Sequence, residues 1–312
     1  MTRASDSRAA GLAVGKAGAL TWLLLAVGIV AVSTSGPLIA AAAAPALAIA
    51  FWRNALASGV LIPLTAVTSR ADVRKLDRRA IGGCVLAGIF LAGHFATWVP
   101  SVTMTSVATS TALVCAQPIW AALIALLTGR RVGGIAWLGV ALAVLGAALV
   151  TGADVTVSGR AVAGDLLAIV GGIFGAAYVT VGERMRTTLT TTVYTALCYP
   201  VCALLLLAVC LVGGVRLAGY PATTWLLLAA MTVGPQFLGH SVVNRVLDTL
   251  SATLVTVVLL LEVPGAALLA RVFLGQRPPP AAIPGIAVLL AGVVVVILAA
   301  RSARHPEAAP DL

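Results

Sequence analysis

The strongest constraint on the fold of this chain is a series of long apolar runs that carry almost no charge. The stretch 281–300, for example, contains no charged side chain. An α-helix rises about 1.5 Å per residue, so roughly 20 apolar residues cross the hydrocarbon core of a bilayer. Only 10% of the 312 residues are charged and 61% are hydrophobic, whereas soluble domains have roughly 25% charged residues. The chain is therefore expected to fold within a membrane.

The runs predict an all-α integral membrane protein with ten transmembrane helices. Helices satisfy their own backbone hydrogen bonds in lipid, and a β-barrel would instead show alternating segments of about ten residues. The first run is expected to be retained, because it is longer than a typical signal-peptide core and nine others follow it. The predicted spans are 17–36, 44–68, 80–99, 102–127, 133–151, 163–182, 190–213, 222–243, 250–274 and 281–300.

Lysine and arginine residues indicate how the chain is oriented, because they are enriched in cytoplasmic loops. With the N-terminus placed in the cytoplasm, fifteen of them fall in cytoplasmic segments and three, Arg160, Arg216 and Arg277, in external loops. We therefore expect a multi-pass protein of the inner (plasma) membrane with both termini in the cytoplasm. The same distribution explains the formal net charge of +10 without a nucleic acid partner.

An internal repeat relates the two halves of the chain. Residues 93–150 match, without a gap, the residues that lie 146 positions later. Rare residue types coincide, since His94 falls on His240 and Pro118 on Pro264. The predicted organisation is a cytoplasmic tail at 1–16, a first repeat at 17–151, an external linker at 152–162, a second repeat at 163–300 and a cytoplasmic tail at 301–312.

Each predicted half contains five helices, so the second half enters the membrane from the opposite side to the first. The halves are then two inverted five-helix repeats, related by an axis in the membrane plane. Such repeats are typical of secondary transporters, in which the substrate binds near the midplane between the halves. Exchanging the roles of the halves gives alternating access, so we predict a small-molecule transporter.

Two stretches and one arginine carry a resemblance to a known family. The stretches from Gln117 to Gly129 and from Leu261 to Gly275 each have a proline late in a span and end in a glycine, and Arg53 lies in the second span. This ordered set resembles the EamA type of the drug/metabolite transporter superfamily. The resemblance implies transport of amino acids, drugs or other small metabolites, with export favoured, and no cofactor.

The chain departs from the pattern of that family at two places. The family usually has Gly-Glu after the fourth and ninth spans, whereas this chain has Gly129-Arg130 and Gly275-Gln276. Roles that the family gives to this glutamate are therefore not carried over.

Glu262 and Arg53 are the charged residues expected deep within predicted spans. A charge at this depth costs roughly 2.5–3.5 kcal/mol on insertion scales. Glu262 is either a proton-coupling group or an anchor for a substrate amine, or else a structural carboxyl that binds backbone freed by Pro264. Arg53 could extend to the membrane surface, bind a substrate carboxylate, or pair with Glu262. The sequence leaves these alternatives open.

Two histidines and a glutamine complete the candidate site. His94 and His240 are equivalent in the repeat, and each could carry protons or simply hydrogen-bond between helices. Gln117 lies beside a proline in the fourth span. The candidate substrate-binding residues are therefore Arg53, His94, Gln117, His240 and Glu262, and the candidate coupling residues are Glu262, His94 and His240.

Other residues are expected to have structural roles. Trp98 and Trp120 could offer aromatic walls to the site. Trp98 and Trp225 lie at external helix ends, however, and are rather expected in the interfacial aromatic belt. Asp165, near the start of the sixth span, is expected to face water. The pattern Gly171-x-x-x-Gly175 predicts close helix packing, and a homodimer through such small residues stays open.

Other functional classes lack supporting motifs. The five cysteines lie inside apolar runs and no histidine has a metal-ligand spacing to them, so we expect no metal site. The sequence has no phosphate-binding loop for ATP, and its three histidines do not form a catalytic set, so we expect no enzyme. An intramembrane enzyme or a non-transporting structural membrane protein remains the alternative. The expected partners are a small-molecule substrate, the lipid bilayer and protons.

Overall fold

The computed structural model describes residues 19–74, 76–127, 129, 133–155, 157–239 and 259–304. Within these ranges the chain is helical and contains no strand, so the all-helical class is confirmed. Eight of the ten predicted spans are long and apolar enough to cross a membrane: Ala19–Ala41, Ala46–Thr68, Arg78–Val102, Val107–Ile124, Gly134–Val155, Gly159–Met185, Thr191–Val212 and Ala282–Ala299. The chain is therefore a multi-pass membrane protein.

The predicted spans 222–243 and 250–274 lie partly outside the described residues. The described part of the first is α12 (Ala222–Met231), which continues as the π-helix η1 (Thr232–Gly239). The described part of the second is α15 (Glu262–Leu274).

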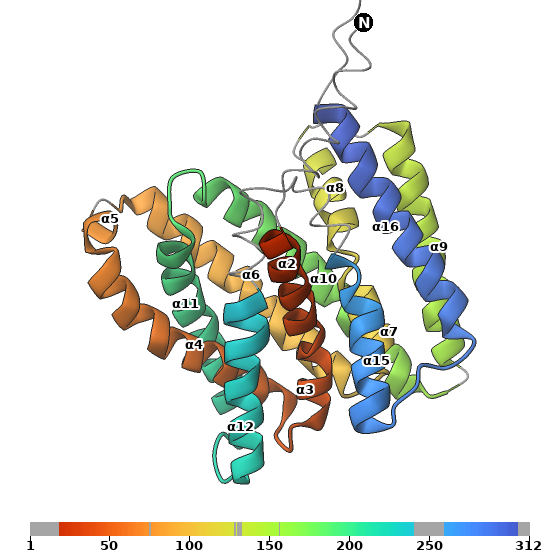
Figure 1. Ribbon diagram of the computed structural model, residues 1–312, viewed down its shortest axis with the longest axis horizontal. Coiled ribbons are helices and arrows are strands. Elements are labelled where there is room, and N and C mark those ends of the chain that lie inside the picture. The colour runs from red at the N-terminus through yellow and green to blue at the C-terminus, as the bar shows by residue number, and fades with distance from the viewer. Residues whose placement is uncertain are drawn as a thin grey trace, which may run out of the picture.

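Two of the complete spans are interrupted near their middle (Figure 1). The first consists of α2 and α3, with a turn at Thr34, and the fourth consists of α7 and α8, with turn residues Cys115 and Ala116. The remaining helices are continuous. The helix bounds are α2 Ala19–Ser33, α3 Ser35–Ala41, α4 Ala46–Thr68, α5 Arg70–Arg74, α6 Arg78–Val102, α7 Val107–Val114, α8 Gln117–Leu127, α9 Gly134–Val155, α10 Gly159–Met185, α11 Thr191–Val212 and α16 Ala282–Arg304.

Short polar residues determine where four of the helices begin. At the start of each of these helices, a side-chain oxygen accepts a hydrogen bond from the N–H three residues later. The capping residues are Asp77 for α6, Ser106 for α7, Ser158 for α10 and Thr190 for α11. Each bond satisfies one of the N–H groups that a helix leaves unpaired at its start. These caps begin helices close to where the predicted spans 80–99, 102–127, 163–182 and 190–213 begin.

The two glycines that carry the family resemblance have the same backbone conformation. Gly129 has φ 82° and Gly275 has φ 65°, in the left-handed region that favours glycine. They are equivalent in the 146-residue repeat and follow α8 and α15. The repeat in the sequence is thus also a repeat of local structure.

Helices α9 and α16 lie side by side at one edge of the molecule (Figure 1). A Cβ at Gly139 would come within 2.8 Å of Gly292 O, and a Cβ at Gly285 within 3.0 Å of Gly146 O. Gly285 and Gly292 are the repeat equivalents of Gly139 and Gly146, so the contact is reciprocal. Because residues that are later in α9 meet residues that are earlier in α16, these two equivalent helices run antiparallel.

The remaining helices pack around the centre of the molecule, where α6 contacts α10 and α4 contacts α11. In the 146-residue repeat, α10 is the equivalent of α2, and η1 is the equivalent of part of α6. The contact between α2 and η1 therefore corresponds to the contact between α10 and α6. The largest group of buried apolar side chains lies among α4, α6 and α11, and a second group lies around α9 and α16. The cavity described next is bounded by the first of these groups.

Candidate functional site

A cavity of about 160 Å³ lies between the two halves of the chain. Both halves contribute to its wall, through α2, α3, α4, α6, α7 and α8 on one side and α10, α11, η1 and α15 on the other. Among the described residues, α9 and α16 contribute none, as expected for helices that carry almost no polar side chains. The polar and aromatic lining residues are Ser35, Arg53, His94, Phe95, Trp98, Gln117, Tyr178, Tyr199, Gln236 and Glu262.

The structure brings four of the five candidate residues to this cavity, namely Arg53, His94, Gln117 and Glu262. The fifth, His240, lies outside the described residues. Their roles in substrate binding and in coupling stay predictions.

Arg53 is buried in the wall of the cavity, with 3% of its surface exposed. Its Nε donates to Gln236 Oε1 at 3.2 Å and its Nη1 to Ser35 Oγ at 3.4 Å. The guanidinium carbon lies 4.4 Å from the centroid of the Phe95 ring, a cation–π contact. A guanidinium has five N–H groups, so these two acceptors leave donor capacity beside the cavity.

One of the sequence hypotheses for Arg53 is wrong, and a second is met only in part. The side chain does not extend to the membrane surface, because its fork is held between α3, α6 and η1. Arg53 and Glu262 line the same cavity and interact electrostatically, but no ion pair joins these two described residues. The third hypothesis, binding of a substrate carboxylate, stays a prediction.

Gln236 is a cavity residue that the sequence analysis missed. It lies in η1, is 3% exposed, and uses its carbonyl for Arg53. Its Nε2 donates to Asn54 Oδ1 at 3.5 Å, so one amide fixes two neighbouring residues of α4. The available signal was its position next to Pro235, since Gln117 likewise adjoins a proline. π-Helical segments often occur at functional sites.

His94 makes a hydrogen bond between helices, which was one of the two roles predicted for it. Its Nδ1 lies 2.8 Å from Gly171 O in α10. A carbonyl only accepts, so Nδ1 carries the proton and the ring is fixed in one orientation. At Gly175, one turn later, a Cβ would come 3.0 Å from His94 Nδ1 and 2.8 Å from Gln117 Nε2. The predicted glycine pair thus allows these side chains to approach α10.

Trp98 does not belong to an interfacial belt, contrary to the prediction. It is 5% exposed, lines the cavity, and stacks on His94 with ring centroids 5.5 Å apart. The ring packs inward because α6 continues past it to Val102. Its Nε1 is buried without a hydrogen-bond partner in the described structure. A buried donor of this kind calls for an explanation, and a bound solute would supply an acceptor.

Gln117 and Glu262 are each the first residue of a helix that begins at the cavity. Gln117 starts α8 after the turn in the fourth span, and Glu262 starts α15 after turn residues Leu260 and Leu261. Pro264 therefore lies in a first turn, where no intrahelical bond is lost. The hypothesis that Glu262 binds backbone freed by this proline thus loses its basis. Helix starts facing a midplane cavity are typical of transporters.

Gln276, one of the departures from the family pattern, makes a contact between the halves. Its Oε1 accepts a hydrogen bond of 2.9 Å from the Val107 N–H at the start of α7. A glutamate carboxylate could accept the same bond, so the substitution keeps this contact while removing a charge.

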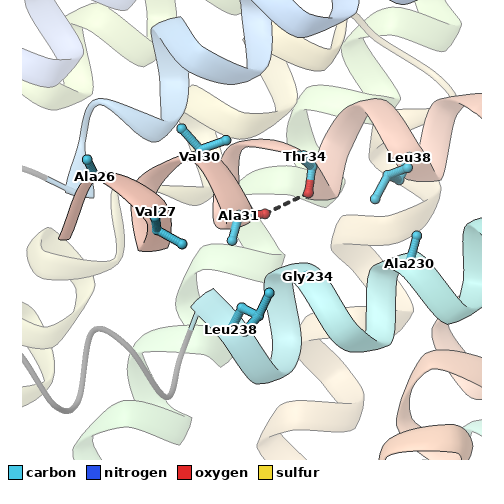
Figure 2. A pocket seen from close by; sticks show the side chains of 9 residues that line it. All are labelled: Ala26, Val27, Val30, Ala31, Thr34, Leu38, Ala230, Gly234 and Leu238. Carbon is cyan, nitrogen blue, oxygen red and sulfur yellow. Dashed lines mark hydrogen bonds between the residues drawn. The ribbon is translucent and has the colours of Figure 1, made fainter. Parts of the chain in front are cut away.

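A larger hollow of about 580 Å³ lies between α2–α3 and α12–η1. Figure 2 shows its lining, formed by Ala26, Val27, Val30, Ala31, Thr34, Leu38, Ala230, Gly234 and Leu238. The one hydroxyl, that of Thr34, donates to Ala31 O at 2.6 Å. This apolar surface offers no polar contact to a solute, so it is not the candidate site.

The fold and the cavity define a class: a polytopic helical membrane protein whose two related halves enclose a small polar cavity. The model of the EamA-like transporter family matches residues 17–152 and, separately, residues 162–298. The chain therefore belongs to the EamA-like transporter family, as the sequence resemblance indicated.

Solved structures include proteins with the same fold. One crystal structure aligns with 90% of this chain and 98% of its own, with a TM-score of 0.60 and 19% sequence identity. At this identity the likeness concerns the fold alone. A search of curated proteins gives no match.

Proposed function

We propose that the protein is a secondary transporter that moves a small metabolite with a carboxylate group, such as an amino acid, by alternating access. Its place is the inner (plasma) membrane, with both termini in the cytoplasm and export as the direction. The observation that carries the substrate class is Arg53, a buried guanidinium that has no carboxylate partner among the described residues. A buried charge without a directly bonded counter-charge is costly, and a bound carboxylate would offset that cost.

The size of the cavity favours a small solute. Its volume of about 160 Å³ is well below the roughly 300–1,000 Å³ of pockets for drug-sized ligands. Phe95, Trp98, Tyr178 and Tyr199 supply aromatic walls, which suit an apolar side chain. A free amino acid is therefore favoured over a bulky drug.

Glu262 faces the same cavity and is the proposed partner of the substrate amine. A carboxylate that binds either an ammonium group or a proton can couple the two, so we also propose Glu262 as a coupling residue. His94 and His240 are retained as further coupling candidates. With Arg53 in α4 and Glu262 in α15, an amino acid would be held between the two halves.

The packing of α9 against α16 supports alternating access. The reciprocal, antiparallel contact of these repeat-equivalent helices is what an axis in the membrane plane produces. Inverted repeats of this kind allow the two halves to exchange conformations around a fixed site. Helices α9 and α16 would hold the halves together while the cavity opens alternately to each side.

The test compares binding of L-amino acids with binding of the corresponding amino acid amides, which lack the carboxylate. Purified protein is titrated with each compound, and counterflow of the acids that bind is measured in proteoliposomes. We expect Arg53→Gln to lower the affinity for the acids about 10- to 150-fold, since hydrogen bonds to charged groups contribute about 1.5–3 kcal/mol. Arg271→Gln is the control, because Arg271 is exposed on α15. Equal binding of acids and amides would overturn the substrate class.

A further inference from the structure

Two buried carboxyl groups lie where the first half of the chain meets the second, away from the central cavity. Asp154 is near the end of α9 and Asp165 is in the second turn of α10, and they are 1% and 0% exposed. Neither oxygen of Asp165 has a hydrogen-bond partner in the described structure. Asp165 was predicted to face water. This prediction is wrong, because Thr105 and the end of α9 bury its side chain.

Among the described residues, hydroxyl groups and not cations surround the two acids. The Thr105 hydroxyl donates to Asp154 Oδ2 at 2.7 Å. Asp165 lies beside Asp154, Thr105 and Thr151, but no hydrogen bond of normal geometry joins its oxygens to them. Arg160 is the basic residue closest in sequence, but it is exposed and donates to Thr103 O at 3.2 Å. Within the described residues, neither carboxyl forms an ion pair.

Two ionised carboxylates in this environment would repel each other. Like charges at short range in a desolvated site repel strongly, and such pairs hold one proton between them. A proton on one acid also supplies the hydrogen-bond donor that the oxygens of Asp165 lack. The two observations, burial without counter-charge and oxygens without donors, therefore call for the same ligand.

We propose that Asp154 and Asp165 form a proton-binding carboxyl–carboxylate pair that closes the junction between the two halves. With the proton bound, the acids share a hydrogen bond and α10 remains against α9. When the proton leaves, both acids are charged, and the junction separates to hydrate them. This site is distinct from the cavity that holds Glu262.

The surroundings of the pair explain how it would act on the rest of the protein. Residues 103–107 comprise the connection between α6 and α7 and the first residue of α7. This segment holds Thr105 against Asp154. It also meets α10 at Gly164, where a Cβ would lie 2.9 Å from Met104 Cβ. Val107 in the same segment donates its N–H to Gln276, which lies between α15 and α16 in the second half. Separation of the two acids would therefore weaken the contacts that residues 103–107 make with α9, with α10 and with Gln276.

The pair also breaks the symmetry of the repeat. The residue equivalent to Asp165 in the first half is Ala19. Two inverted halves give two conformations of similar energy, and a proton site present in only one half favours one of them. Protonation of this pair would thus bias the conformational equilibrium toward the state described here.

Sodium is the competing occupant, because it also prefers oxygen ligands. The described residues hold no third His, Cys, Asp or Glu beside the pair, and the Thr105 hydroxyl already donates its proton to Asp154. A pair with two carboxyls and one remaining hydroxyl suits a proton better than a cation of higher coordination number.

The first test is infrared spectroscopy of the purified protein at neutral pH. A protonated carboxyl has a C=O stretching band that an ionised carboxylate lacks. We expect Asp165→Asn and Asp154→Asn each to remove one such band, whereas Asp72→Asn, at an exposed position of α5, should keep it. Glu262→Gln identifies any band that comes from the cavity. Retention of the band in both aspartate variants, or its loss on replacing choline chloride by sodium chloride, would overturn the proposal.

The second test follows amide hydrogen exchange of residues 103–107 as a function of pH, corrected for the intrinsic exchange rate. In the wild type, protection should be lost as the pH rises, because the pair releases its proton. Asp165→Asn, which can donate its amide to Asp154, should keep the segment protected at all pH values. The same pH dependence in both proteins would contradict the proposed role. Neither test needs a substrate, so the proton site and the proposed transport function can fail independently.

Discussion

Replacing Gly292 by alanine tests the antiparallel crossing of α9 and α16 quantitatively. A Cβ at this position would lie 2.5 Å from Ala143 N and 2.6 Å from Gly139 O, whereas real Cβ atoms essentially never approach closer than 3.0 Å. Both atoms belong to the backbone, so the helices themselves must separate. Overpacking typically costs about 1–3 kcal/mol, and the gain from removing a helical glycine is about 0.5–1 kcal/mol. We expect a net loss of stability of about 1–2 kcal/mol.

The assay is thermal unfolding of the purified protein in detergent. A change of 1 kcal/mol shifts the melting temperature by roughly 2–4 °C in proteins of this size class, so Gly292→Ala should melt about 2–8 °C below the wild type. Gly146→Ala should behave alike, because the contact is reciprocal. Gly152→Ala is the matched control on α9, since a Cβ there meets nothing within 4 Å. Melting of Gly292→Ala at the wild-type temperature would refute the crossing geometry.

Three further predictions follow from the site, the contact between the halves and the orientation. Gly175→Ala should weaken L-amino-acid binding and leave the melting temperature nearly unchanged, because its Cβ would displace the side chains of Gln117 and His94 at the cavity rather than backbone. A lower melting temperature with unchanged binding would contradict this. Gln276→Ala should cost about 1 kcal/mol through the lost bond to Val107, measured by melting, and Gln276→Glu should restore it; equal losses would argue against capping. A single cysteine at position 157 should react with an impermeant maleimide from outside the cell, and one at position 72 only after permeabilisation; the opposite pattern would invert the topology.

The helical spans and the repeat were predictable because each depends on local sequence. Apolar length determines a span, and eight of the predicted spans are present in full. The interruptions were missed, although the sequence carries a signal for each: Ser33, Thr34 and Ser35 precede Pro37 in the first span, and Gln117 precedes Pro118 in the fourth. Single polar residues and prolines are tolerated within membrane helices, so the apolar length alone did not show where the backbone turns.

Residues of the candidate site were predictable where a charged side chain is energetically costly in lipid. They were less predictable where the position of a neutral side chain depends on its contacts with other helices. Arg53 and Glu262 stood out by charge alone, and the structure places both at the cavity. Gln236 and Trp98 were missed or misassigned, because an amide or an indole is tolerated at many depths. Asp165 was misassigned for a different reason. Its burial depends on Thr105, which is distant in sequence, and on how the end of α9 at Asp154 packs against α10.

The separation between the α9–α16 pair and the cavity has a consequence for how such proteins diversify. The glycines that fix the crossing lie on helices that contribute no described residue to the cavity wall. Substitutions around the cavity can therefore alter which solute is recognised while the pairing of the two halves is inherited unchanged. Divergence of specificity within this architecture should accumulate on α4, α6, η1 and α15, and the crossing glycines should vary far less among descendants of one ancestor.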